Sequence, residues 1–216
     1  MKKNLSYITV VLGFCLCFSC TRIQEDFYPD GSLQSRIPYR LGKENGVATY
    51  YKKNRAFPYL EITMKNGKKE GKAIQYFFNG HIEMESFYLH DSLHGLETIY
   101  DKDGQKLSEV SYVHGKKDGI YRSWYANNVL HVDGRYKQDL FDGEWHIFDE
   151  RGLLVGEGTF NMGKGQQITY DLNGNLKYMT TYDNNMKNGQ EVHFTPKGDT
   201  LKVIFFQDDH IMSVRE

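Results

Sequence analysis

A glycine recurs at a nearly constant interval through this chain, and that period restricts the possible folds more than any other feature. Successive intervals are 25, 24, 24, 24, 22 and 24 residues. Such a period is typical of repeat proteins, in which each unit buries its apolar side chains only against neighbouring units. The repeat-defining glycines are Gly46, Gly71, Gly95, Gly119, Gly143, Gly165 and Gly189.

Other positions in this frame identify each unit as a β-hairpin. Nine residues after most of these glycines stands a second glycine or an asparagine, which closes a tight turn by adopting a positive φ. Positions eleven and seventeen hold apolar and aromatic residues, and their odd spacing places them on one face of a strand with a period of two. We therefore expect each repeat to contribute two short strands with one aromatic or aliphatic face.

Aromatic residues also recur five residues after the glycines, so two aromatic positions mark each repeat. One hairpin cannot bury such side chains alone, because it depends on stacked neighbours for stability. Two roles are open for them: core where the sheet curls over them, and contact surface where it does not. The candidate core or contact aromatics are Tyr76, Tyr88, Tyr100, Tyr112, Trp124, Tyr136, Phe148, Phe160, Tyr170 and Tyr182.

The repeat frame reaches back to Arg22, where Phe27 and Gly31 occupy their expected positions although the starting glycine is missing. The count is then about eight repeats. The sequence predicts an all-β fold, an array of about eight antiparallel β-hairpin repeats that form an elongated twisted sheet over residues 20–216.

Three departures from the period make local predictions. Arg55 replaces the turn glycine of the second repeat and Pro58 follows it, so we expect a longer, distorted hairpin there. The copy that begins at Gly143 is two residues short, and we place the deletion in its second turn, around residues 161–163. The acidic pair at residues 208–209 is expected to act as a charged stop that discourages edge-to-edge pairing.

Two segments carry the repeat in its clearest form, GKAIQYFFNG at residues 71–80 and GQQITYDLNG at residues 165–174. They resemble the MORN-repeat variant, as does the junction YVHGKKDG at residues 112–119. Chains built from this variant are often grouped as a YwqK-like antitoxin family. The resemblance implies an elongated, twisted antiparallel sheet of hairpins and a role as an interaction surface or a toxin-neutralising partner. It supplies no catalytic residues.

The N-terminal segment has the order of an export signal. Two lysines precede an apolar stretch over residues 5–18, which Ser19 and Cys20 follow. This stretch is shorter than the roughly 20 apolar residues of a membrane span. Residues 17–20 resemble the lipobox of bacterial lipoproteins, with Cys20 as the lipidated residue; an ordinary cleaved signal is the alternative. We predict a lipoprotein-type signal peptide at residues 1–19 and a protein that is lipid-anchored to a membrane of the bacterial cell envelope, periplasmic or surface-exposed.

Composition argues against several functions. The 27 Lys and Arg residues match 28 Asp and Glu residues, so no basic surplus is available to neutralise the phosphates of nucleic acid. All three cysteines lie within the first 20 residues, so neither disulfides nor thiol catalysis is expected in the mature part. No catalytic triad, zinc-protease motif or convergent carboxylate pair stands out. We therefore predict a protein that is not an enzyme, has no cofactor and binds no nucleic acid.

Three local patterns look like ligand sites but fit turns better. Residues 158–165 approach a phosphate-binding loop, yet Gly165 stands where that loop needs Ser or Thr. Residues 101–104 resemble the start of a calcium loop without its later ligands. His90 and His114 occupy the same position in adjacent repeats, about 9–10 Å apart, which is too far for them to share a metal ion. We predict neither a nucleotide site nor a metal site.

The leading hypothesis is a non-catalytic, membrane-tethered repeat scaffold that binds an unidentified protein or envelope polymer through its aromatic face or a sheet edge. The alternative is an antitoxin or immunity-type protein that neutralises a co-encoded toxin. We expect the binding surface in the most regular copies, from Gly71 to Tyr182. A basic cluster could also touch anionic headgroups, although lysines at hairpin ends usually serve solubility. Its members are Lys65, Lys68, Lys69 and Lys72.

Overall fold

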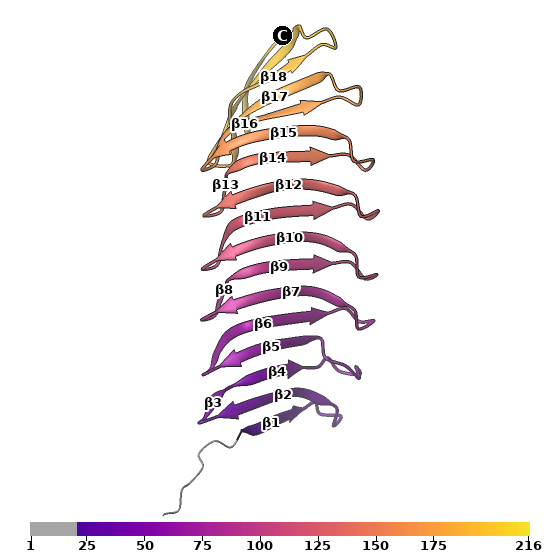
Figure 1. Cartoon of the computed structure of the whole chain (residues 1–216), viewed down its shortest axis with the longest axis vertical. Helices are drawn as coiled ribbons and strands as arrows, with labels where there is room; N and C mark the ends of the chain where they lie inside the picture. Colours follow the sequence, from indigo (N-terminus) through magenta and orange to yellow (C-terminus); the bar gives the residue numbers. More distant parts are fainter. Residues whose placement is uncertain (1–20) are drawn as a thin grey trace, which may run out of the picture.

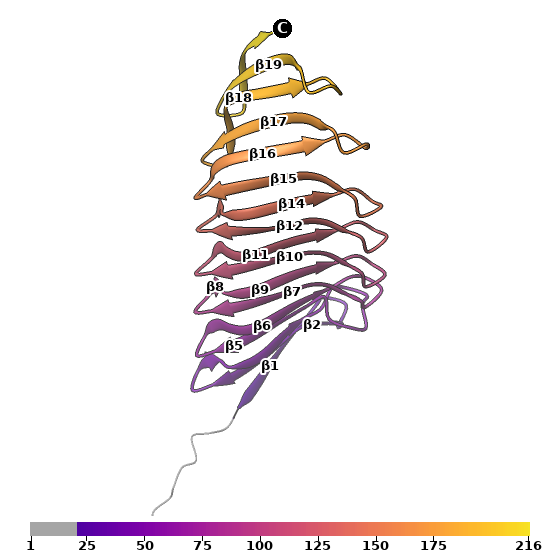
Figure 2. The same ribbon diagram turned by 45° about the horizontal axis from the view of Figure 1, so that its top comes forward.

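The computed structural model describes residues 21–216, which form one antiparallel sheet of twenty strands. The strands are β1 (Arg22–Phe27), β2 (Leu33–Arg40), β3 (Lys43–Glu44), β4 (Gly46–Tyr50), β5 (Leu60–Lys65), β6 (Lys68–Tyr76), β7 (Ile82–Leu89), β8 (Ser92–Leu93), β9 (Gly95–Tyr100), β10 (Lys106–Val113), β11 (Lys116–Trp124), β12 (Leu130–Lys137), β13 (Leu140–Phe141), β14 (Gly143–Phe148), β15 (Leu154–Asn161), β16 (Lys164–Tyr170), β17 (Leu176–Asp183), β18 (Met186–Phe194), β19 (Thr200–Gln207) and β20 (His210–Arg215). Over these residues the pairings follow the chain order from β1 to β20, and the sheet does not close. The hairpins are stacked along the long axis (Figure 1), and the stack is twisted (Figure 2). The predicted all-β array of hairpins is confirmed.

One edge of the sheet, which we call the short-turn edge, consists of two-residue turns. Both central residues of each turn have a positive φ, between 47° and 81°. Such turns match the twist of antiparallel strands. Each turn after the first is also hydrogen-bonded to the preceding repeat. For example, the Asp91 amide donates to the Lys69 carbonyl, and Asp91 Oδ1 accepts from the Lys69 amide. The turns are Leu41-Gly42, Asn66-Gly67, His90-Asp91, His114-Gly115, Gln138-Asp139, Met162-Gly163, Asn184-Asn185 and Asp208-Asp209.

The opposite edge, the long-turn edge, contains the turns that were predicted from position nine. In one of them the Gly104 amide donates to the Asp101 carbonyl at 3.1 Å, and Asp101 Oδ1 accepts from the amides of Asp103 and Gln105. The calcium-loop pattern is therefore a turn in which the carboxylate is already used by the backbone. Adjacent turns are linked as well, because the side-chain amide of Asn79 donates to the Lys102 carbonyl of the next repeat.

Most of the repeat-defining glycines lie at a β-bulge. Val110 is opposite Tyr121 but Tyr112 is opposite Lys117, so Ser111 alone faces three residues that include Gly119. Gly119 has a φ of 119°, and an added Cβ would lie 2.8 Å from the Ser111 Cβ. Both the backbone conformation and the close approach require glycine at this position.

Gly165 is the exception, and it corrects the predicted position of the two-residue deletion. Strands β15 and β16 pair without a register shift from Gly156 to Asn161, and the turn at Met162-Gly163 is complete. The missing residues are therefore those of the bulge that follows the turn, and not residues of the turn itself. Strand β16 enters the sheet without the local kink that a bulge introduces elsewhere.

The other two departures had different outcomes. The second repeat does have a long irregular loop, between Tyr50 and Leu60, in which the Arg55 guanidinium lies 4.5 Å from the Phe57 ring. The prediction of a charged stop at residues 208–209 is wrong. Both aspartates adopt the two-residue turn conformation of the short-turn edge and lead into β20.

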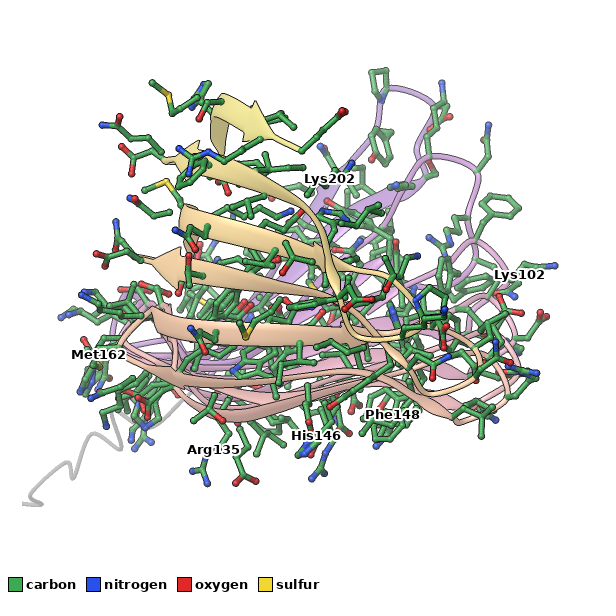
Figure 3. All side chains as sticks on the ribbon, turned by 90° about the horizontal axis from the view of Figure 1, so that it is seen from above. Lys102, Arg135, His146, Phe148, Met162 and Lys202 are labelled. Carbon is green, nitrogen blue, oxygen red and sulfur yellow. The ribbon has the colours of Figure 1, made fainter. Side chains whose placement is uncertain are left out.

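The sheet is bowed, so its two faces differ. Seen along the long axis (Figure 3), Arg135, His146 and Phe148 project from the convex face, while Lys202 lies on the concave side. The concave face carries positions two, four, thirteen, fifteen and seventeen of each repeat, and the convex face carries positions one, three, five, fourteen and sixteen. Most of the deeply buried side chains lie at concave positions two and fifteen, so the core is on the concave side. These are Ile37, Ala48, Ala73, Ser86, Val110, Trp145, Thr180 and Glu191.

Candidate functional site

The two sets of aromatic side chains that mark the repeats lie on opposite faces. Tyr88 is opposite Gly71, whereas the Tyr76 hydroxyl reaches across the other face and donates to Glu61 Oε2 at 2.8 Å. The prediction of one aromatic face is wrong. Position seventeen lies opposite the glycine at position zero and shares its face with the even positions of the first strand, whereas position five lies on the other face of that strand. The concave set is Tyr88, Tyr112, Tyr136, Phe160 and Tyr182, and the convex set is Tyr76, Tyr100, Trp124, Phe148 and Tyr170.

The concave aromatics form a core cluster in the middle of the array. The Trp145 ring centroid lies 4.7 Å from that of Phe141 and 5.1 Å from that of Tyr136, and Trp145 is only 9% exposed. Space for the indole comes from Gly134, where an added Cβ would lie 2.3 Å from a ring atom of Trp145. Phe160 extends the cluster and is also buried. These side chains serve packing, and burial of such rings is a major source of stability.

The tyrosine hydroxyls of both faces stay protonated over a wide pH range. Burial raises the pKa of Tyr136 and the pKa of Tyr182 to about 12. On the convex face, burial and the hydrogen bond to Glu61 raise the pKa of Tyr76 to about 12. These phenols are hydrogen-bond donors and are poor candidates for a general base near neutral pH.

The concave face also contains a buried carboxylate, Glu191, which is 5% exposed. It accepts hydrogen bonds from Lys187 Nζ at 2.6 Å and Thr180 Oγ1 at 3.0 Å, and a ring nitrogen of His193 lies 2.8 Å away. Burial alone would raise the pKa of Glu191, but these three contacts outweigh burial and lower it. A charge so fully partnered stabilises the fold and is not free for chemistry.

The convex face carries a column of carboxylates that sequence reasoning missed. Arg122 Nε donates to Asp133 Oδ1 at 2.7 Å, Lys72 and Lys106 pair with two other members, and the Tyr170 hydroxyl donates to a fourth. The sequence signal for this column is that its members follow one another at a constant interval of 24 residues. The interval identifies a column only when acidic residues in strands are separated from those in turns. The column consists of Glu61, Glu85, Glu109, Asp133 and Glu157.

Three connected hollows lie on the convex face between β11 and β18, and we call them together the polar groove. The central hollow has a volume of about 420 Å³, and its neighbours have volumes of about 320 and 370 Å³. The central hollow shares Glu144 and His146 with one neighbour and Gly165 and Gln166 with the other. Volumes of this size are in the range of ligand sites, and most of the side chains that line these hollows are polar.

Other candidates from the sequence are occupied by internal contacts. Lys65 pairs with Glu70, Lys72 pairs with Glu85, and Lys69 lies 5.0 Å from the Tyr88 ring, so most of the basic cluster is engaged within the sheet. His90 and His114 are exposed first residues of two-residue turns, and residues 158–165 form a strand and turn. Within residues 21–216 there is no group of three or more metal-ligating side chains.

The fold and its bulge glycines place the chain in the class of repeat proteins that are built from β-hairpins in one open sheet. Five segments of the chain match the family model described as the MORN repeat variant. The chain is thus a repeat protein that contains MORN-variant repeats, as the resemblance of the sequence implied. No curated protein matches the chain. The matched segments are residues 23–40, 69–90, 93–114, 117–138 and 164–184.

The predicted signal peptide at residues 1–19 and the predicted lipidation site Cys20 lie outside the described residues. Among residues 21–216 no helix is long and apolar enough to cross a membrane. The candidate functional site is the convex face, on which three hollows adjoin one another in the polar groove.

Proposed function

We propose that this chain is a non-catalytic scaffold, tethered to a membrane through a lipid on Cys20, which binds an envelope component or another protein along its convex face. The observation that carries the proposal is the difference between the two faces. The concave face is packed by its own aromatic cluster around Trp145, whereas the convex face presents hydrogen-bonding side chains at regular intervals beside three hollows. A repeating surface of this kind suits an extended partner.

The arrangement of the charged groups supports a binding role without catalysis. Arg122 neutralises Asp133 on the convex face, and Lys187 neutralises Glu191 on the concave face. An acid-base pair for catalysis needs groups whose pKa values are shifted toward neutrality beside a reacting atom. Turnover of a defined substrate by the purified chain, abolished by replacement of one polar side chain, would contradict this part of the proposal.

The anchor is tested by Cys20→Ser, with Cys15→Ser, which lies in the apolar stretch before the lipobox, as the matched control. We expect the first variant to lose the mass of the lipid and to move to the soluble fraction, because a myristoyl-sized chain contributes about 0.8 kcal/mol per buried CH₂ to membrane binding. The control should stay with the membrane. Unchanged fractionation of Cys20→Ser would exclude lipidation at this residue as the tether.

The binding face is tested by site-specific photocrosslinking in intact cells. A photoreactive residue at Gln166, which is exposed in the polar groove, should capture the partner. The same residue at Met162, which is exposed on the short-turn edge (Figure 3), is the control and should capture little. Capture at Met162 alone would move the binding site from the convex face to the edge.

The resemblance of the repeats to antitoxin-type chains favours a second candidate function, the neutralisation of a co-encoded toxin. Expression of the adjacent gene, with and without this chain, tests it. Toxicity that appears only when the chain is absent would support neutralisation, and a harmless neighbour would count against it.

A further inference from the structure

We propose that the polar groove, which crosses β11 to β18 on the convex face, binds a neutral polyhydroxylated chain, that is, a polysaccharide. The inference rests on the proposed scaffold function and names the chemical class of its partner. It starts from the shape of the site. The three hollows follow one another across successive strands, so the groove runs along the long axis of the array and would accept an extended polymer better than a compact ligand.

The lining of the groove offers donors and acceptors in close alternation. Glu144 and Glu157 provide carboxylate oxygens, His146 and Gln166 provide ring and amide groups, and Thr159 provides a hydroxyl. Carboxylates, amides and hydroxyls can form hydrogen bonds with sugar hydroxyls in both directions. Because strands present alternate side chains to one face, these groups all point away from the core.

Aromatic rings flank the groove at a fixed spacing. Phe148 lies beside His146, with 6.4 Å between the ring centroids, and the Tyr170 hydroxyl donates to Glu157 Oε1 at 2.5 Å. Both rings belong to the convex set, which occurs on every second strand, and every second strand lies roughly 10 Å further along the sheet. That is about the length of a disaccharide in an extended polysaccharide. Each repeat would thus meet one disaccharide with one ring and one set of polar groups.

The charge of the groove favours a neutral chain over a polyion. Four carboxylates and three basic side chains line the three hollows, and the ion pair between Arg122 and Asp133 already neutralises one charge of each sign. A polyanion or a polycation would meet like charges along the same path. An extended polypeptide is the other polymer of suitable shape. It would gain most from an open sheet edge, where backbone groups are unpaired, and the groove crosses the middle of the sheet.

The experiment uses the full chain in detergent micelles and measures binding by calorimetry and by amide shifts in NMR spectra. The probes are a β-1,4-linked glucose hexamer, its N-acetylated equivalent, and a peptide of alternating lysine and glutamate. The groove variants are His146→Ala combined with Gln166→Ala, and Phe148→Ala. The matched controls are Gln190→Ala and Phe194→Ala, which occupy the repeat positions of Gln166 and Phe148 in later copies. Gln190 and Phe194 do not line the hollows, whereas Gln166 lines them and Phe148 adjoins the lining residue His146.

We expect at least one hexasaccharide to bind, with amide shifts in β14 and β16. Loss of two hydrogen-bonding side chains should weaken this binding roughly tenfold, and both controls should bind within about twofold of the wild type. Equal loss in groove and control variants would overturn the proposal, as would binding of the peptide alone or of no probe at millimolar concentration. In the latter cases the scaffold function still stands if photocrosslinking at Gln166 captures a protein.

Discussion

The fit of Trp145 over Gly134 makes a sharp prediction about the core. The Gly134→Ala substitution adds one methyl group at a backbone conformation that alanine can adopt, since this glycine does not have a positive φ. The new Cβ would lie 2.3, 2.5 and 2.7 Å from three atoms of the Trp145 indole. Contacts this short are impossible, so the indole or the strand must move.

The expected cost follows from what the indole would lose. Overpacking of a core typically costs about 1–3 kcal/mol, and each aromatic pair contributes about 0.5–1.5 kcal/mol beyond burial. Trp145 makes two pairs within 5.1 Å, with Phe141 and Tyr136. Where no clash exists, replacing glycine by alanine stabilises the folded protein by about 0.4–1 kcal/mol, because it reduces the conformational entropy of the unfolded chain. The net effect of Gly134→Ala is therefore a loss of about 1–5 kcal/mol.

A double-mutant cycle with Trp145→Ala isolates the clash. Urea unfolding followed by circular dichroism measures the free energy of unfolding of the wild type, both single variants and the double variant. In the Trp145→Ala background, Gly134→Ala should be neutral or slightly stabilising, so the sign of its effect reverses. An equal loss in both backgrounds would show that the glycine is needed for a reason other than room for the indole.

Three further predictions test the bulge, the buried carboxylate and the buried phenols. Gly119→Ala should lower the free energy of unfolding by about 1–3 kcal/mol, because its φ of 119° strains alanine; an unchanged urea midpoint would contradict this. The folded-state pKa of Glu191 lies below its ordinary value of 4.5, so its ionised form contributes stability that is present above that value and is lost as the pH falls through the lower pKa. Glu191→Gln should therefore destabilise near neutral pH, and the deficit in thermal melts should shrink below about pH 4.5; a deficit independent of pH would argue against linkage. Tyr136→Phe should remove one phenol that ionises at about pH 12 in an absorbance titration, while Tyr182 still ionises there; loss of an ordinary phenol near pH 10 instead would be inconsistent with burial.

The period and the turn residues were sufficient to predict the array. Glycine, asparagine and aspartate at fixed positions determine turns through backbone conformation alone, which is a local property of the sequence. The frame therefore located the long turns, the irregular loop near Arg55 and a repeat without its glycine at Arg22. The prediction failed at residues 208–209, where the two aspartates were interpreted as a source of charge repulsion. Aspartate also favours turns, and these two residues form one.

The two faces could not be assigned from parity alone. Which positions share a face depends on the number of residues in the turn, and a β-bulge changes the register again between Ser111 and Gly119. For this reason the convex aromatics were grouped with the concave ones, and the carboxylate column was overlooked. A register with position seventeen opposite the glycine at position zero would have separated the faces, because it places position five on the other face of the first strand.

The central hollow of the groove lies at the strand pair of β15 and β16, which lacks the regular bulge. A bulge increases the local twist of a strand pair, and each regular copy has one beside its glycine. Strands β15 and β16 lack it, and Gly165, which has no bulge, lines the central hollow. The adjoining convex positions hold Gln166 and Thr159, whereas the copy that begins at Gly71 places Lys72 and Phe87 there. The deletion and the exchange to small or polar side chains act together, because a flatter strand pair with shorter side chains leaves a hollow. The irregular copy thus provides the central hollow, and regular copies on either side complete the groove.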